Sequence, residues 1–179
     1  TLFDERAELG GMMRYGIPGF RTPRTVLDAE IQRILDLGVA TRMNCRIGTD
    51  VTLDQIKNEF DAVFLGLGAQ SGRPLAVDGA EAPNCVTATA FLKAFNDGRM
   101  QHVGKRVVGV GGGDTSIDVA TVARRLGHID QIHESDRPEN VIAGHMAHDV
   151  ADASVRQGAD VTLTSIFAVD NMQASRHEV

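Results

Sequence analysis

Three successive glycines between an apolar run and an amphipathic segment are the residues best placed to do chemistry. Residues 105–118 read KRVVGVGGGDTSID. Gly111 would allow a sharp turn, Gly113 would let the backbone approach a pyrophosphate with no Cβ in the way, and Ser116 is small enough for close helix–strand packing. The start of the following helix would present N–H groups and a partial positive charge to a diphosphate.

This pattern predicts dinucleotide binding, because a strand before the glycines and a helix after them are the context that the motif requires. The residues expected to contact the cofactor are Gly111, Gly112, Gly113, Asp114, Thr115 and Ser116. The alternative is a glycine turn that only packs a helix on a sheet. The end of the next strand selects the cofactor in such folds, and its residues 164–167 read TSIF, which carries neither an acidic nor a basic signal.

The elements that would position this turn alternate along the chain. Apolar spacing predicts helices at 25–37, 52–60, 87–96, 115–126 and 145–157. Buried strands are expected at 62–67, 106–110 and 160–166, and shorter strands at 1–3 and 39–43. Thr52 and Gln55 have the spacing of a capping box, and Gly38 is a helix stop. The alternation predicts α/β architecture with parallel, Rossmann-like sheets.

Composition narrows the class of protein further. The 179 residues are 42% hydrophobic and 23% charged, with a net charge of -6, which is typical of a globular domain and disfavours a nucleic-acid surface. No apolar run is long enough for a transmembrane helix, so no membrane partner is expected. The two cysteines, Cys45 and Cys85, have no metal-site spacing and suit a reducing cytoplasm.

Four segments in series resemble one family, the small (β) subunit of NADPH-dependent glutamate synthase, whose relatives include the FAD/NADPH part of dihydropyrimidine dehydrogenase. The segments are GGMMRYGIPGFRTPR at 10–24, FDAVFLGLGA at 60–69, GGGDTSID at 111–118 and NMQASRHEV at 171–179. They run in the family's order from one end of the chain to the other. The resemblance implies a flavoprotein with two dinucleotide-binding domains.

The resemblance also implies FAD contacts in the first part of the chain. Thr1–Phe3 would be the second strand of the FAD domain, and Asp4 would hold the adenosine ribose. The remaining expected contacts are Gly10, Gly11 and Met12 near the flavin or its diphosphate, Arg21 at the flavin site, and the backbone of Ile47 on the adenine side. Without the resemblance, Asp4 is a solvated acid, Arg21 a surface charge and Ile47 a core residue.

The implied domain organisation is partial. Residues 1–72 would be the C-terminal portion of the first FAD-binding segment, and residues 73–179 an incomplete NAD(P)-binding domain with an insertion at about 128–158. The first FAD fingerprint and a cysteine-rich iron–sulfur region would lie before residue 1, so the chain is expected to be a fragment that binds no FAD alone. His145 and His148 in the insertion, with Asp149 or Asp152, suggest metal ligands, but a solvated polar helix is the preferred interpretation.

The resemblance implies an NAD(P)H-dependent oxidoreductase. Electrons would pass from nicotinamide through FAD to iron–sulfur centres and then to the glutamate synthase large subunit or another acceptor, such as dissimilatory sulfite reductase. No catalytic side chain is expected, because hydride transfer needs alignment of two rings, and Asp118 is interpreted as a structural residue. The alternatives are a nucleotide-binding module without turnover and an interaction scaffold. The family's arginine-bearing YRRDR aligns with 165–169, SIFAV, which removes the usual support for NADPH.

Overall fold

The computed structural model describes residues 1–129, 142 and 159–165. The chain divides into two compact units. The first unit contains Thr1–Arg14 and Gly19–Ala69, and the second contains Tyr15–Pro18 and Gln70–Val179. Among the described residues, no helix is long and apolar enough to span a membrane.

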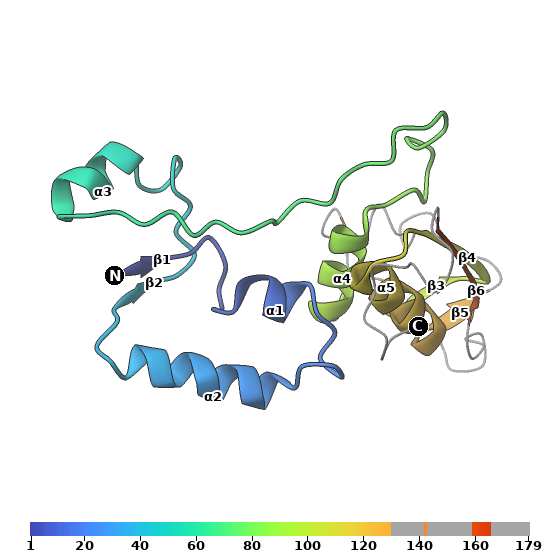
Figure 1. The fold of residues 1–179 in the computed structure, drawn as a ribbon, viewed down its shortest axis with the longest axis horizontal. Helices are drawn as coiled ribbons and strands as arrows, with labels where there is room; N and C mark the ends of the chain where they lie inside the picture. The colour runs from blue at the N-terminus through green and yellow to red at the C-terminus, as the bar shows by residue number, and fades with distance from the viewer. Residues whose placement is uncertain (130–141, 143–158, 166–179) are drawn as a thin grey trace. The chain divides into compact units, whose positions relative to one another are not determined.

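A short parallel pair of strands begins the first unit. Strands β1 (Leu2–Phe3) and β2 (Thr41–Arg42) lie side by side (Figure 1), in the register Leu2↔Thr41. The backbone ladder continues past β1, because the Asp4 amide donates to the Arg42 carbonyl at 3.1 Å. Both strands were expected, although the structure makes each shorter than predicted.

The first unit also contains α2 (Arg24–Leu35), α3 (Leu53–Glu59) and all of α1 (Gly11–Tyr15) except its last residue, Tyr15. Gly38 lies just after α2 and fits the predicted helix stop. Its φ is 91°, and its amide donates a hydrogen bond to the Leu35 carbonyl at 2.9 Å. The capping box is confirmed: the Gln55 amide donates to Thr52 Oγ1 at 3.1 Å and the Thr52 amide to Gln55 Oε1 at 2.8 Å. Helix α1 was not predicted, because its two leading glycines indicate a loop.

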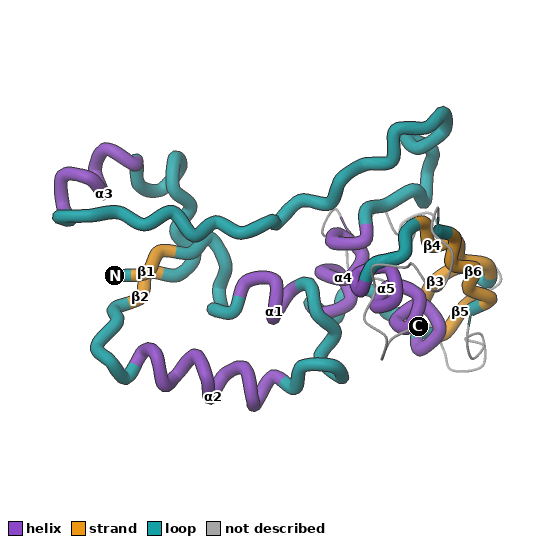
Figure 2. Tube along the Cα trace, in the orientation of Figure 1, coloured by secondary structure: helices purple, strands orange, loops and turns teal. Residues whose placement is uncertain are grey.

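The predicted buried strand at 62–67 is wrong. Figure 2 draws this segment as loop, and its side chains are exposed, with Phe64 at 93% and Leu67 at 71%. A strand needs a hydrogen-bonded neighbour as well as an apolar sequence. In the part of the chain that the structure describes, the first unit's sheet contains only β1 and β2. The apolar run therefore remains extended and outside any described sheet.

Within residues 70–129 and 159–165, the second unit contains parallel strand pairs and the two helices named next. Its elements are α4 (Ala88–Asn96), β3 (His102–Gly104), β4 (Arg106–Val110), α5 (Asp114–Arg125), β5 (Gly127–Ile129) and β6 (Asp160–Thr164). Strand β4 pairs with β6 over five residues, and β3 pairs with β5. All described pairings in the chain are parallel, which confirms the predicted α/β class with parallel sheets.

Strand β5 was not predicted, and it extends into the start of the expected insertion at about 128–158. Helix α5 ends one residue before the predicted boundary, at Arg125, and Gly127 begins β5. Strand β3 was not predicted either, since three residues give too short a pattern to recognise. The predicted helix at 145–157 and its histidines lie outside the described residues.

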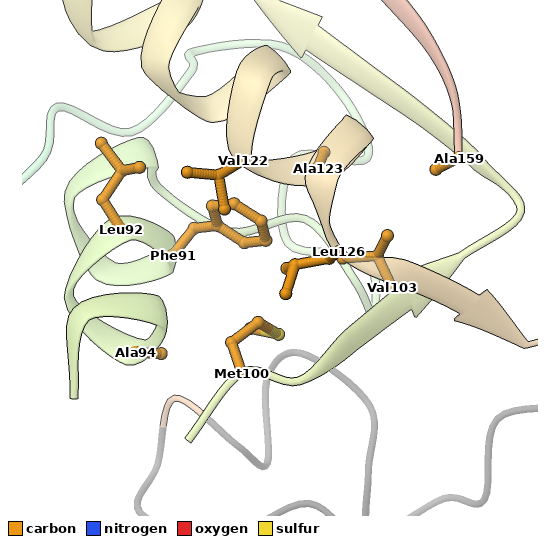
Figure 3. Packing of buried hydrophobic residues seen from close by; sticks show 9 residues of the cluster. All are labelled: Phe91, Leu92, Ala94, Met100, Val103, Val122, Ala123, Leu126 and Ala159. Carbon is orange, nitrogen blue, oxygen red and sulfur yellow. The ribbon is translucent and has the colours of Figure 1, made fainter. Parts of the chain in front are cut away.

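The core of the second unit forms where α4 and α5 pack together (Figure 3). Phe91 on α4 points toward Val122 on α5, and Leu126 and Val103 lie beside them. Leu92 is 1% exposed and Val122 is fully buried. Tyr15 belongs to this unit because the Asn96 side-chain amide donates to its carbonyl at 3.0 Å and the Lys93 ammonium lies 5.6 Å from its ring centre.

Replacing Leu92 by alanine is expected to lower the free energy of unfolding by about 2–5 kcal/mol, because a fully buried leucine leaves a cavity that the surroundings fill only in part. Urea denaturation followed by circular dichroism measures the change. Val108→Ala is the control, since Val108 is 66% exposed on β4 and should cost below about 0.5 kcal/mol. A loss at Leu92 no larger than the loss at Val108 would contradict the assigned core.

Candidate functional site

The glycine turn after β4 has a geometry that only glycine satisfies at its first position. Gly111 has φ of 140°, and its amide donates to the Thr164 carbonyl at 2.7 Å, which joins the turn to the end of β6. A Cβ at Gly111 would fall on the Ser116 hydroxyl and lie 3.4 Å from the Ser116 Cβ. The chain therefore turns tightly off the strand and brings the first turn of α5 close behind it.

The third glycine differs from the first. Gly113 precedes α5 with φ of -99° and ψ of 172°, a conformation open to any residue, and its carbonyl accepts the Ser116 amide at 2.9 Å. A Cβ at Gly113 would meet no atom within 4 Å. Packing within the described chain does not require glycine here. The open space lies where the fingerprint places an approaching diphosphate.

The first turn of α5 carries the remaining residues of the predicted cofactor set. Asp114 and Thr115 are exposed, whereas Gly112 and Ser116 are half-buried. The first amides of a helix point out of its N-terminus and favour negative charge there. Asp118, one turn further along, is 5% exposed and belongs to the buried side of the helix.

The first unit brings two of its predicted FAD contacts to one edge of the β1–β2 pair. Asp4 directly follows β1, and its carboxylate accepts the Arg6 amide at 2.8 Å. The Asp4 carbonyl accepts the Cys45 amide at 2.9 Å. Asp4 therefore lies beside the segment that contains Ile47, which is two residues after Cys45. Ile47 forms an isolated parallel bridge with Val51 and is 38% exposed. It is therefore not a core residue.

Gly10 immediately precedes α1, and Gly11 and Met12 are the first two residues of that helix. Gly10 has φ of 120°, and a Cβ there would lie 3.1 Å from Leu27 and 3.4 Å from Ile31 on α2. Gly11 has φ of 50° but would meet no atom within 4 Å. Met12 is half-buried. The first glycine is therefore fixed by packing and conformation together, and the second by conformation alone.

Two arginines of the same segment were missed by the sequence reasoning, which singled out only the exposed Arg21. Arg14 is 9% exposed, and the Arg24 guanidinium donates to the Met13 carbonyl at 3.0 Å. Burial first, and then the nearby Arg14 charge, lower the pKa of Arg24. The sequence did show both arginines within the family-like segment 10–24. Their partners on other elements could not be read from it.

Among the described residues, no group of three His, Cys, Asp or Glu side chains lies close enough to hold a metal ion. The metal ligands considered at His145 and His148 fall outside the described residues. Each unit thus has its own cofactor-binding candidate: a glycine turn at the start of α5 in the second unit, and a strand edge with a glycine pair in the first.

Together, a parallel α/β fold and a glycine turn at the start of a helix define a dinucleotide-binding class of protein. Residues 17–175 match the family described as pyridine nucleotide-disulphide oxidoreductase, and the chain belongs to that family. The fold is shared with the solved structure of Mycobacterium tuberculosis FprA in complex with NADPH, at a TM-score of 0.69 and 18% identity, over 98% of this chain and 38% of that one.

Curated relatives are more similar in sequence. A putative glutamate synthase [NADPH] small chain of Cereibacter sphaeroides is 35% identical over 136 residues, which cover 71% of this chain and 33% of the relative. An NAD-dependent dihydropyrimidine dehydrogenase subunit PreT of Salmonella typhimurium is 37% identical over 131 residues, covering 71% and 31%. The matched region thus spans about a third of the length of these relatives, and the resemblance drawn from the four sequence segments is confirmed.

Proposed function

We propose that the full-length protein containing this chain is an NAD(P)H-dependent flavin oxidoreductase of the glutamate synthase small-subunit type. One observation carries the proposal: Gly111 is glycine because the fold requires it, whereas Gly113 is glycine beside open space at the start of α5. A glycine without a packing reason, at the position where a fingerprint admits a diphosphate, favours a bound dinucleotide over a turn that only packs a helix.

The two units receive different cofactors in this proposal. The second unit, within the predicted NAD(P)-binding domain 73–179, would hold the nicotinamide nucleotide through its residues from Gly111 to Ser116. The first unit, within the predicted FAD-binding segment 1–72, would hold FAD through Asp4, the turn at 10–12, Arg21 and the Ile47 backbone. A carboxylate at a strand end suits two ribose hydroxyls, and the half-buried Asp4 retains an oxygen beyond the one that accepts the Arg6 amide.

The protein's residues bind and orient in this reaction, and the bound cofactors supply the hydride and electron chemistry. The backbone at Gly113 sets how closely a diphosphate approaches α5, and Asp4 fixes the position of a ribose. No side chain needs to donate a proton at the reacting atoms, because hydride transfer depends on the alignment of two rings. Asp118 is buried in α5, which fits a structural role.

The electron acceptor would be a partner redox subunit reached through iron–sulfur centres elsewhere in the full-length protein. The names of two relatives support this. The relatives include a putative glutamate synthase small chain and a protein named NADPH-Fe(3+) oxidoreductase subunit beta, so similar chains are named as subunits of redox enzymes. The acceptor could be the glutamate synthase large subunit or a different partner such as sulfite reductase.

Anaerobic titration of the purified full-length protein with NADH and with NADPH tests the function. We expect bound flavin whose visible absorbance bleaches with either nucleotide. Nucleotide binding in calorimetry without bleaching would favour a nucleotide-binding module without turnover. Neither binding nor bleaching would favour an interaction scaffold, and each of these two results would overturn the proposal.

Replacing Asp4 by asparagine is expected to weaken FAD binding about tenfold, because neutral hydrogen bonds to the ribose are weaker than charge-assisted ones. The Asn side-chain oxygen can still accept the Arg6 amide, so the turn should persist. Titration of the flavin-depleted protein with FAD gives the dissociation constant. Asp36→Asn is the control in the same unit, since the Asp36 carboxylate accepts the Gln32 side-chain amide at 2.8 Å on the exposed surface, away from the proposed FAD contacts. Equal effects of the two substitutions would remove Asp4 from the site.

A further inference from the structure

A buried arginine lies directly behind the glycine pair of the first unit. Arg14 is 9% exposed, which is unusual for arginine unless its guanidinium is paired. Its Nε donates to the Leu9 carbonyl at 2.5 Å, and its Nη2 donates to the carboxylate of Asp28 on α2. Glu8 adds a longer ion pair at 3.7 Å. The single guanidinium therefore joins the residues before the turn, the helix after it and α2.

The contacts of Arg14 cross a turn made by two glycines. Gly10 and Gly11 have φ of 120° and 50°, and glycine enters and leaves this region without strain, so contacts of the turn, and not a local backbone preference, must hold its geometry. Leu9 precedes the glycine pair and Arg14 follows it, so their hydrogen bond closes the turn. A Cβ added at Gly10 would also lie 3.2 Å from the Arg14 Cβ. Arg14 thus packs against the turn as well as bonding across it.

The polar contacts of Arg14 are directed inward and fit a supporting role. Its guanidinium is committed to a backbone carbonyl and to Asp28, whereas Arg21, the predicted flavin contact, is exposed. Asp28 is 55% exposed at its side chain, so the loss of Arg14 would leave its carboxylate in water and not stranded in the interior. Removing Arg14 would then alter the conformation of the turn, and it would not leave an unpaired charge buried in the protein.

We propose that Arg14 is a positioning residue that holds the Gly10–Gly11 turn in the geometry required for FAD binding. The inference rests on the proposed binding of FAD by the first unit. Arg14 acts through the turn and not by touching the cofactor. Its role needs two hydrogen bonds in fixed directions from one planar group, which a lysine ammonium cannot reproduce.

The test uses the full-length protein, depleted of flavin and titrated with FAD at a temperature well below its unfolding midpoint. We expect Arg14→Met to weaken FAD binding at least about tenfold. Arg14→Lys, which keeps the charge, should remain weakened by more than about threefold. Arg33→Met is the matched control on α2, because Arg33 pairs with Glu30 at the surface, and it should bind FAD as the unchanged protein does.

Binding of NAD(P)H to the second unit separates a local effect from general unfolding, since Arg14→Met should leave its dissociation constant unchanged. If Arg14→Met does not fold, Arg14→Lys and Asp28→Asn decide, and FAD binding as tight as in the unchanged protein in both would overturn the inference. Lower thermal stability of a folded Arg14→Met with unchanged FAD affinity would also overturn it. Absence of FAD binding in the unchanged protein would overturn the proposed function as well, so the two failures are distinguishable.

Discussion

Replacing Gly113 by valine is expected to abolish binding of nicotinamide nucleotides while the protein stays folded. The backbone at Gly113 is extended, with φ of -99° and ψ of 172°, which a β-branched residue adopts readily. A Cβ there meets no atom within 4 Å, so the substitution adds little internal strain. The same open space is where a diphosphate must approach α5, and the branched side chain would fill it.

Calorimetric titration of the full-length protein with NADH and NADPH measures this effect. We expect affinity to fall by at least about a hundredfold, a difference of about 2.7 kcal/mol, with an unchanged circular dichroism spectrum. Unchanged affinity in a folded Gly113→Val protein would mean that the three glycines only pack a helix on a sheet. The open space at Gly113 would then no longer support the proposed function.

Gly111→Ala is the matched comparison, because it changes a glycine of the same turn for a different reason. Its φ of 140° and the Ser116 hydroxyl in the place of a Cβ predict a loss of stability of about 1–3 kcal/mol. We therefore expect different effects: Gly113→Val should lower the affinity for nicotinamide nucleotides, and Gly111→Ala should lower the free energy of unfolding. Ser116→Ala combined with Gly111→Ala should recover part of that stability, since it removes the obstructing hydroxyl.

The second unit was largely predictable because its signals are local. Strand β4 and helix α5 flank the glycine turn close to the expected bounds, since an apolar run, a glycine turn and a periodic segment each report on neighbouring residues. The segment 62–67 failed for the opposite reason. Its apolar sequence indicates a strand, but a strand forms only against a neighbour, and pairing is not written in the segment itself.

The candidate site divides in the same way. The residue types at Gly111 and Gly113 were read from the fingerprint, but their different reasons for being glycine required the position of Ser116 and the open space before α5. The contact between Arg14 and Asp28 could not be predicted from the sequence, because Asp28 lies 14 residues away on another helix. Motifs thus predicted where cofactors would bind, whereas the contacts proposed to hold those segments in place became visible only in the tertiary structure.

The last expectation is that the full-length protein does not strongly prefer NADPH over NADH, so that their dissociation constants differ by less than about a hundredfold. The adenosine ribose of a dinucleotide on this turn would lie near the end of the strand adjacent to β4. That strand is β6, and the bond from the Gly111 amide to the Thr164 carbonyl (2.7 Å) places its end beside the turn. The residues that follow, 165–169, read SIFAV and carry no charge; all but Ser165 lie outside the described residues.

Selective capture of a 2′-phosphate, which carries nearly two negative charges, usually needs arginines at this place. Each charge-assisted hydrogen bond contributes about 1.5–3 kcal/mol, so two arginines would give a preference of about a hundredfold or more. No carboxylate stands within 165–169 to repel the phosphate either, since Asp170 comes later. Dissociation constants for both nucleotides at one salt concentration decide the matter. A preference for NADPH above about a hundredfold would contradict the expectation and direct attention to Arg176 and Arg137, whose replacement by methionine should then abolish it.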